Sequence, residues 1–197
     1  MKRYLILGLP DDRLAAGIRE RQRALSSLSG DDLALRFPVH ITLRGPFWGH
    51  DSPMRQFCGD LPGLCRGFSP VPVDLAGPVF VPPDLCWFEV QRDASRFAEL
   101  LRLHALLEDE THRCVVVDDV STRFKAEGFR PHATLGWKSP ASLAGVEQAC
   151  GPQGTRLHGR LESVAVAVYP HGWPSEGSVA VIQTVPLACT EEAPERL

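Results

Sequence analysis

The chain has 197 residues, of which 44% are hydrophobic and 23% are charged, close to the average for soluble globular proteins. This composition excludes a wholly disordered or fibrous protein and fits one large folded domain. The formal net charge of -3 argues against a protein that coats nucleic acid non-specifically, since such binding needs many Lys and Arg contacts to phosphates, but it leaves room for a small basic site.

The first apolar stretch is short. Residues 4–9 are apolar but are followed by Pro10-Asp11-Asp12, so the stretch is too short for a signal segment or a membrane span. We therefore expect a cytoplasmic protein. We also expect it to be a monomer. The six cysteines are scattered and lack the Cys/His spacing of a zinc site, so we expect free thiols and no metal. We also expect no cofactor.

The first half of the chain predicts a strand, a helix, a strand, a helix and a strand. The spacing of the hydrophobic residues, and the turn-forming residues that separate the hydrophobic segments, predict strands at residues 4–9, 39–47 and 71–81. The first helix begins after Asp11 or Asp12 as N-cap and extends to about residue 27, and a short irregular helix covers residues 53–64. This half ends at Pro82-Pro83.

The second half predicts the same order, with one additional strand. Strands are expected at residues 85–91, 129–137, 160–169 and 179–185, and helices at 94–110 and 142–149. The pattern indicates one α+β domain over residues 1–197, with pseudo-repeats at about 1–81 and 84–187 and an acidic tail at 188–197. We expect a bilobal arrangement in which two antiparallel sheets face a central cleft and the helices lie outside.

The first motif lies on an alternating strand, Pro38-Val39-His40-Ile41-Thr42-Leu43-Arg44. Side chains alternate between the two faces of a strand. His40, Thr42 and Arg44 are therefore predicted to share one face, opposite an apolar face that belongs to the core.

The second motif repeats this pattern within residues 129–137. Arg130, His132 and Thr134 alternate with apolar residues and are predicted to share a face. Two copies of His-x-Thr-Leu in matching places are expected by chance in only about one chain in a thousand, whereas a single His-x-Thr is common. The pair therefore indicates a functional site.

These side chains suit a phosphodiester. A neutral imidazole accepts a proton from water while an imidazolium donates one to the leaving oxygen, and the ordinary histidine pKa of about 6.5 allows both forms near neutral pH. Threonine hydroxyls donate to the non-bridging oxygens, where charge develops, and a guanidinium supplies positive charge. We therefore expect His40 and His132 to be catalytic, and the threonine and arginine of each motif, Thr42, Thr134, Arg44 and Arg130, to bind phosphate.

The tandem motifs resemble those of the two-histidine (2H) phosphoesterase superfamily, in the branch of 2'-5' RNA ligases and RNA 2',3'-cyclic phosphodiesterases. His40-Ile41-Thr42-Leu43 fits the first H-x-T-x motif and His132-Ala133-Thr134-Leu135 fits the second. The resemblance implies a bilobal fold with pseudo-two-fold symmetry and metal-independent hydrolysis of a terminal 2',3'-cyclic phosphate to a 2'-phosphate. It also implies reversible 2'-5' joining of RNA ends.

By the same resemblance, His40 protonates the departing O3' and His132 activates water, although the near-symmetry of the motifs leaves the reverse assignment open. Two alternatives for the function also stay open. One is the same chemistry on another cyclic phosphate, such as a cyclic nucleotide or an ADP-ribose cyclic phosphate. The other is a non-catalytic RNA-binding module, which the intact His and Thr of both motifs argue against. The partner is therefore an RNA end or a small cyclic phosphate, and not a membrane.

Some residues outside the motifs are weaker candidates. Arg123 and Lys125 precede the second motif and are candidates for a basic rim. Trp48, Tyr169 and Trp173 are candidates for stacking on a nucleobase.

Overall fold

The structure is a computed structural model that describes residues 1–81, 85–118, 128–136, 142–169 and 179–188. Within these ranges the protein is an α+β fold, as predicted, with four α-helices and eight strands. The elements, in chain order, are β1 (Lys2–Pro10), α1 (Asp12–Ser29), a 3₁₀ turn (Leu33–Arg36), β2 (Ile41–Gly49), α2 (Asp51–Cys65), β3 (Val71–Val81), β4 (Leu85–Val90), α3 (Ala94–His112), β5 (Val115–Asp118), β6 (His132–Gly136), α4 (Leu143–Cys150), β7 (Thr155–Tyr169) and β8 (Ala180–Pro186).

The local signals in the sequence place most of these elements correctly. Asp11 is the N-cap of α1, and its carboxylate accepts a hydrogen bond from the Leu14 amide at 2.8 Å. Gly30 ends the helix in the left-handed conformation that glycine adopts most easily. The strand predicted at residues 71–81 coincides with β3. The short strand β5 was not predicted, and Pro82, Pro83 and the tail from residue 189 lie outside the described residues.

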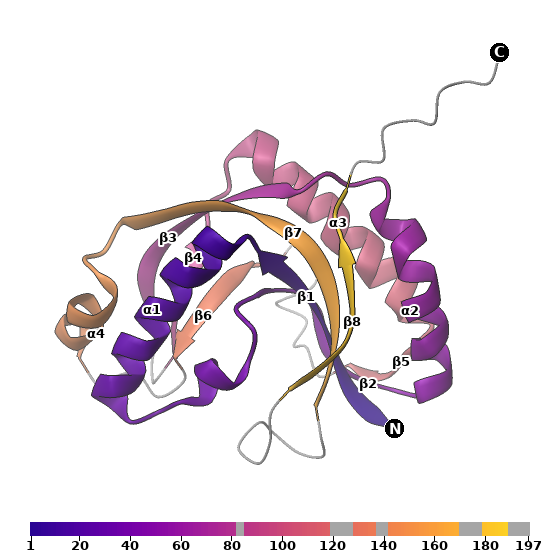
Figure 1. Cartoon of the computed structure of the whole chain (residues 1–197), viewed down its shortest axis with the longest axis horizontal. Coiled ribbons are helices and arrows are strands. Elements are labelled where there is room, and N and C mark those ends of the chain that lie inside the picture. The colour runs from indigo at the N-terminus through magenta and orange to yellow at the C-terminus, as the bar shows by residue number, and fades with distance from the viewer. Residues whose placement is uncertain (82–84, 119–127, 137–141, 170–178, 189–197) are drawn as a thin grey trace.

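The predicted pair of sheets is not found in the described structure, which has a single eight-stranded antiparallel sheet. Its order is β5-β2-β1-β7-β3-β4-β6, with β8 also paired to β7. The reason is the length of β7, whose first part, Thr155 to Leu161, pairs with β3 and whose later part pairs with β1. In Figure 1 this long strand arches over the molecule and joins the strands of the two halves.

The strand order itself is symmetric. If β1 is exchanged with β4, β2 with β6, and β3 with β7, the path β2-β1-β7-β3-β4-β6 reads the same in reverse. The two motif strands, β2 and β6, are equivalent under this exchange, and they contact each other although they are far apart along the path. The internal duplication of about residues 1–81 and 84–187 stays a prediction, with which this strand order agrees.

The helices cross between the halves. Helix α1, from the first half, packs against α4 and contacts β6, whereas α3, from the second half, packs against α2 and contacts β2. Figure 1 shows α1 and α4 together on one side and α2 and α3 together on the other. Each motif strand is therefore covered by a helix from the other half of the chain.

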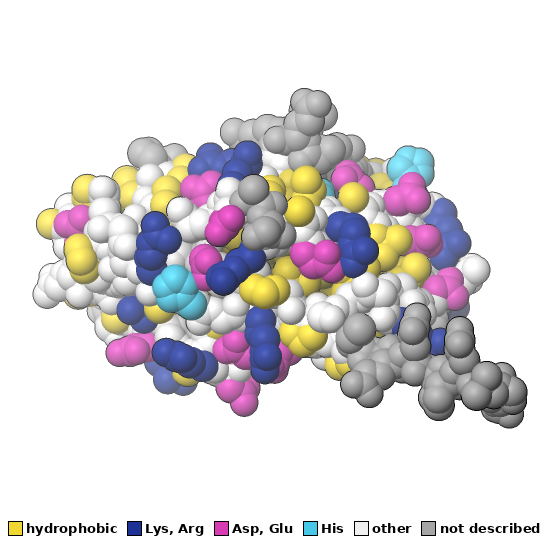
Figure 2. Space-filling view, turned by 90° about the horizontal axis from the view of Figure 1, so that it is seen from above, with side chains coloured by type: hydrophobic (Ala, Val, Ile, Leu, Met, Phe, Trp, Pro, Cys, Tyr) yellow, Lys and Arg dark blue, Asp and Glu magenta, His cyan; other side chains and the backbone are white. Residues whose placement is uncertain are grey.

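The surface carries both signs of charge. On the face seen in Figure 2, Lys and Arg alternate with Asp and Glu, and apolar side chains lie between them. This mixed pattern agrees with the small net charge and gives that face no extended basic surface. Within the described residues, no helix combines the length and apolarity needed to cross a bilayer.

Candidate active site

The first motif places His40 immediately before β2. The Nδ1 atom of His40 lies 2.8 Å from the main-chain oxygen of Pro38, and the ring stacks on Phe37 with centroids 5.7 Å apart. Thr42 lies opposite Leu7 of β1, which packs in the same small apolar cluster as Phe37. Directly opposed residues of antiparallel strands share a face, so Thr42 lies on the side of the sheet where Leu7 and Phe37 pack. His40 stacks on Phe37 and therefore lies on this side too.

The second motif repeats this geometry. His132 is the first residue of β6, and its Nδ1 lies 2.7 Å from the main-chain oxygen of Arg130. Its ring stacks on Trp87 of β4, with centroids 4.3 Å apart and planes at 29°. Thr134 lies directly opposite Trp87 and therefore shares the face of His132.

The hydrogen bonds of the two histidines fix their tautomers. A carbonyl oxygen only accepts, so Nδ1 of each ring must carry the hydrogen and donate it. In each neutral imidazole the basic lone pair is then on Nε2. His40 and His132 therefore have the same tautomer, in which Nδ1 donates to the main chain and Nε2 is left to exchange a proton with a ligand.

The two imidazoles lie close enough to interact electrostatically. Burial lowers the pKa of His40 to about 4, the bond to Pro38 raises it in part, and a positive charge on His132 lowers it further. Burial also lowers the pKa of His132, while the bond to Arg130 and the charge of Glu89 oppose this shift. Both rings are therefore neutral at pH 7 without ligand. A bound phosphate anion would raise both pKa values and favour the protonated form that an acid needs.

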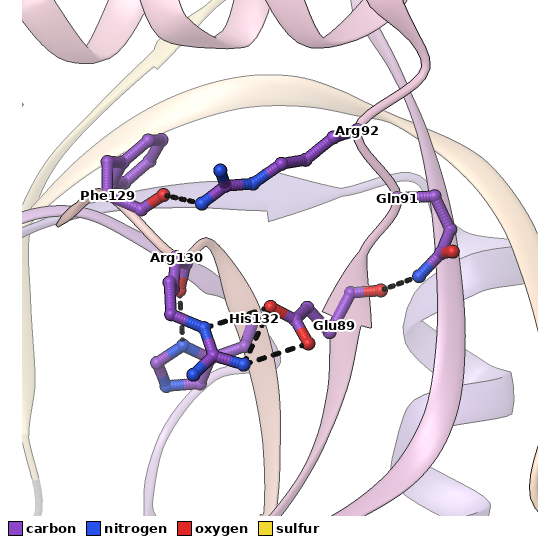
Figure 3. Close-up of polar contacts among 6 residues, drawn as sticks. All are labelled: Glu89, Gln91, Arg92, Phe129, Arg130 and His132. Carbon is purple, nitrogen blue, oxygen red and sulfur yellow. Dashed lines mark hydrogen bonds and ion pairs between the residues drawn. The ribbon is translucent and has the colours of Figure 1, made fainter. Parts of the chain in front are cut away.

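Arg130 lies beside the site but is paired with a carboxylate. Its Nε and Nη2 atoms donate to the two oxygens of Glu89 at 3.0 and 3.1 Å, and its guanidinium also lies over the ring of Trp87. Glu89 is the cross-strand partner of His132, so the ion pair borders the second motif (Figure 3). A phosphate bound here would share Arg130 with Glu89.

The expectation that Arg44 shares a face with His40 is wrong. In the pairing of β1 with β2, Leu7 opposes Thr42 but Ile6 opposes Arg44, so β2 has one extra residue, a β-bulge, between them. Ile6 belongs to the main core, and Arg44, only 6% exposed, lies on that side, with its guanidinium over Phe47. The bulge turns the arginine away from the site.

Each motif strand is held by a side chain from the opposite half. Gln22 of α1 donates from Nε2 to the main-chain oxygen of Thr134 at 2.8 Å. His104 of α3 lies 2.6 Å, from Nδ1, from the main-chain oxygen of Leu43, and its ring stacks flat on Phe129 at 3.8 Å. Both side chains are buried. His104 therefore contacts the first motif strand and also the segment that leads into the second.

Trp87, Glu89 and Phe37 were not predicted from the sequence. A signal for the first two was present, because Trp87 and Glu89 alternate along β4 and so share one face. Of the aromatic candidates, Tyr169 is buried beside Phe37. Trp173, Arg123 and Lys125 lie outside the described residues.

The described residues contain no group of three or more His, Cys, Asp or Glu side chains arranged to hold a metal ion.

A comparison with protein families matches residues 10–172 to the model of the 2'-5' RNA ligase superfamily. The match covers most of the chain and includes both motifs, and the protein therefore belongs to this superfamily of two-histidine phosphoesterases. No curated protein matches the sequence.

Solved structures share the fold at low sequence identity. A protein of Thermus thermophilus matches with a TM-score of 0.61 and 16% identity, over 96% of this chain and all of that one. Escherichia coli LigT, crystallised with 3'-AMP, matches with a TM-score of 0.54 and 16% identity, over 95% of this chain and 98% of LigT. LigT crystallised with phosphate gives a TM-score of 0.52 at 14% identity.

Proposed function

We propose that the protein hydrolyses RNA ends that carry a 2',3'-cyclic phosphate and leaves a 2'-phosphate, without a metal ion or another cofactor. The observation that carries this proposal is the matched hydrogen bonding of His40 and His132, which places a basic Nε2 on each of two neighbouring imidazoles. A reaction that needs one base and one acid at a single phosphorus atom uses such a pair.

The steps balance with these two side chains. Nε2 of His132 takes a proton from water as the water oxygen bonds to phosphorus, and the P–O3' bond breaks as protonated His40 gives its proton to O3'. The hydroxyls of Thr42 and Thr134 donate to the non-bridging oxygens, on which negative charge grows in the transition state. The products are a 2'-phosphate and a free 3'-hydroxyl. When the 5'-hydroxyl of another RNA end takes the place of water, the same displacement at phosphorus forms a 2'-5' linkage, and the reverse of that step regenerates the cyclic phosphate and the 5'-hydroxyl.

The pKa values do not by themselves choose which histidine is the acid. Burial lowers the pKa of both histidines, and for His132 the charge of Glu89 raises the pKa while that of Arg130 lowers it. These directions do not rank the two rings as acids. We therefore take the assignment that the family resemblance implies, with His40 as acid.

Two further observations support a nucleotide substrate. The chain belongs to the 2'-5' RNA ligase superfamily, and LigT, which shares the fold, has been crystallised with 3'-AMP, ATP and NADP⁺. The small net charge and the mixed surface of Figure 2 fit recognition of an RNA end better than recognition of a long duplex.

The test is to incubate the purified protein, in EDTA, with a short RNA that ends in a 2',3'-cyclic phosphate and to separate 2'-phosphate from 3'-phosphate products. We expect the 2'-phosphate. Loss of activity in EDTA would indicate a metal enzyme. Turnover of a non-RNA cyclic phosphate alone would keep the chemistry and change the substrate.

A further inference from the structure

Trp87 is a buried side chain that does not belong to the hydrophobic core. It lies on β4, only 4% exposed, opposite Val79 of β3 and Thr134 of β6. Its neighbours along the strand, Cys86 and Phe88, belong to the main core, whereas Trp87 is in neither of the two hydrophobic clusters that the described residues form. Because side chains alternate along a strand, Trp87 points to the opposite face, where the side chains of the second motif lie.

The indole of Trp87 packs against the ring of His132. Their centroids are 4.3 Å apart and their planes meet at 29°, so the imidazole lies over the face of the indole. The guanidinium of Arg130 also lies over this indole, 5.7 Å from the centroid of the ring. The two basic side chains of the second motif therefore share one aromatic neighbour.

Packing alone does not account for a tryptophan at this position. Nε1 of Trp87 is buried and donates to no acceptor among the described residues. A buried donor without an acceptor lowers the stability of a fold, whereas a phenylalanine would fill much of the same space without that cost. The contact with the basic side chains of the motif is the remaining physical role for the indole.

The aromatic contacts of the two histidines differ in strength. His40 also lies on an aromatic ring, that of Phe37, but the centroids of these rings are 5.7 Å apart. A cation is attracted to the face of an aromatic ring within about 6 Å of its centroid, and tryptophan attracts it more strongly than phenylalanine. Trp87 therefore stabilises a protonated His132 more than Phe37 stabilises a protonated His40.

The charges nearest to His132 are those of an ion pair. Burial lowers the pKa of His132, and of the charges beside it Glu89 raises the pKa and Arg130 lowers it. Glu89 and Arg130 are hydrogen-bonded to each other, so their effects on the imidazole oppose (Figure 3). The indole adds an attraction for the protonated ring that this pair does not supply.

The other elements that contact β6 are α1, the 3₁₀ turn and β2. Helix α1 contacts β6 through the uncharged amide of Gln22, and the charge of His40, just before β2, interacts with that of His132. Of the arginines on these elements, Arg19 donates to main-chain oxygens of the turn, Arg36 forms an ion pair, and Arg44 lies on the core side. All of these charges can be changed separately from the indole.

We propose that Trp87 is a positioning residue, whose indole holds the ring of His132 in place and stabilises the imidazolium that forms when His132 takes a proton from water. The inference rests on the proposed function and adds to it a residue outside both motifs. The indole is buried and acts through the imidazole, so it affects the proton transfer and not the binding of the cyclic phosphate. Removal of the indole should therefore lower kcat and leave KM nearly unchanged.

The first measurement is an NMR titration of the imidazole resonances, with His132→Ala to assign those of His132. Trp87→Leu removes the aromatic face, and we expect the titration midpoint of His132 to move to lower pH by about 0.5 to 1 pH unit. Trp87→Phe keeps a ring of weaker attraction, so its midpoint should lie between those of the wild type and Trp87→Leu. If Trp87 only buried His132, its removal would admit water and move the midpoint to higher pH instead.

Phe37→Leu is the matched control, because it removes the aromatic neighbour of the other histidine. It should leave the midpoint of His132 nearly unchanged. Since Arg130 also contacts the indole, Trp87→Leu is repeated in an Arg130→Met background, where we expect the same displacement of the midpoint. A displacement that disappears in this background would mean that Trp87 acts only through Arg130, which would overturn the proposal.

The pH dependence of kcat is the second measurement. For Trp87→Leu, kcat on an RNA with a 2',3'-cyclic phosphate should fall by about threefold or more at pH 8. The acid limb of the profile should move to lower pH together with the midpoint of His132. A purely structural defect would lower kcat by the same factor at every pH and leave the limb in place.

The outcomes separate the two proposals. A midpoint of His132 that is unchanged or higher in the Trp87 variants would overturn the role of Trp87, whatever their activity. If the midpoint moves as expected but the wild-type protein hydrolyses no cyclic phosphate, the proposed function fails, while the contact of the indole with the imidazolium stands. If Trp87→Leu does not fold, the smaller displacement expected for Trp87→Phe decides.

Discussion

His104, a buried histidine of α3, hydrogen-bonds the main-chain oxygen of Leu43 in the first motif strand, at 2.6 Å from Nδ1. The same ring lies flat on Phe129, which leads into the second motif. A helix from the second half of the chain thus contacts the segments that present both catalytic candidates, and this contact makes the fold sensitive to the protonation of His104.

We expect the protein to lose stability in mild acid. Burial lowers the pKa of His104 below the ordinary value of 6.5, although the bond to Leu43 and the charge of Glu108 oppose the shift, and the pKa values of His40 and His132 are also lowered. The unfolded chain therefore takes up protons near pH 6.5 that the folded chain binds only at lower pH. The free energy of unfolding should fall as the pH decreases below 6.5, by at most about 1.4 kcal/mol per pH unit for each such histidine.

Urea denaturation between pH 7.5 and pH 5 measures this slope. His104→Gln keeps a donor for Leu43 but removes the titration, so its slope should be smaller than that of the wild type. Equal slopes would mean that His104 does not contribute.

Replacing either catalytic candidate should abolish most of the activity. His40→Ala and His132→Ala each remove one proton-transfer group, so we expect kcat to fall by about 100-fold or more for each. Circular dichroism should show that both variants are folded. Because the two rings act on one reaction, the double variant should lose little more than a single variant. If a variant keeps the wild-type rate, the replaced histidine does not transfer a proton in the reaction.

A substrate with a better leaving group should identify the acid. In a cyclic phosphate with sulfur in place of O3', the leaving thiolate needs little protonation. If His40 is the acid, this substrate should restore much of the activity of His40→Ala but not that of His132→Ala. The reverse pattern would exchange the two roles. Each variant is measured on both substrates, so its rate on the ordinary oxygen substrate is the control for its rate on the sulfur substrate.

The carboxylate of Glu89 should hold the pKa of His132 higher than it would otherwise be. Its charge raises the pKa of His132, so Glu89→Gln should lower that pKa, and the change also releases Arg130, whose charge acts in the same direction. NMR titration of the imidazole resonances measures the shift. Glu108→Gln is the matched control, because Glu108 raises the pKa of His104 instead. Glu108→Gln should lower the pKa of His104 and leave the pKa of His132 unchanged. Any other pattern would contradict the pairing of Glu89 with His132 and of Glu108 with His104.

The two motif arginines should behave differently. Arg44→Met alters a buried side chain on the core side of β2, so it should lower stability by about 1–2 kcal/mol and leave KM nearly unchanged. Arg130→Met alters a partly exposed guanidinium beside His132, so it should raise KM for the cyclic phosphate. Thermal melts and KM values for both variants test this. A large increase in KM for Arg44→Met would show that the arginine reaches the substrate.

The sequence by itself determined the pattern of the motifs and the local elements. The alternation around His40 and His132 places each histidine on one face with the threonine two residues later, and this relation depends only on the geometry of a strand. The N-cap at Asp11 and the glycine at the end of α1 are equally local, since they act within one turn of helix.

The tertiary structure decided what depends on pairing between distant strands. The extra residue in β2 that turns Arg44 into the core is defined only against β1. The same is true of the single sheet, because β7 joins the halves by pairing with β3 along one part and β1 along another. Glu89 lies beside His132 only because β4 pairs with β6 in one register. Register is a long-range property, and periodicity along the chain does not contain it.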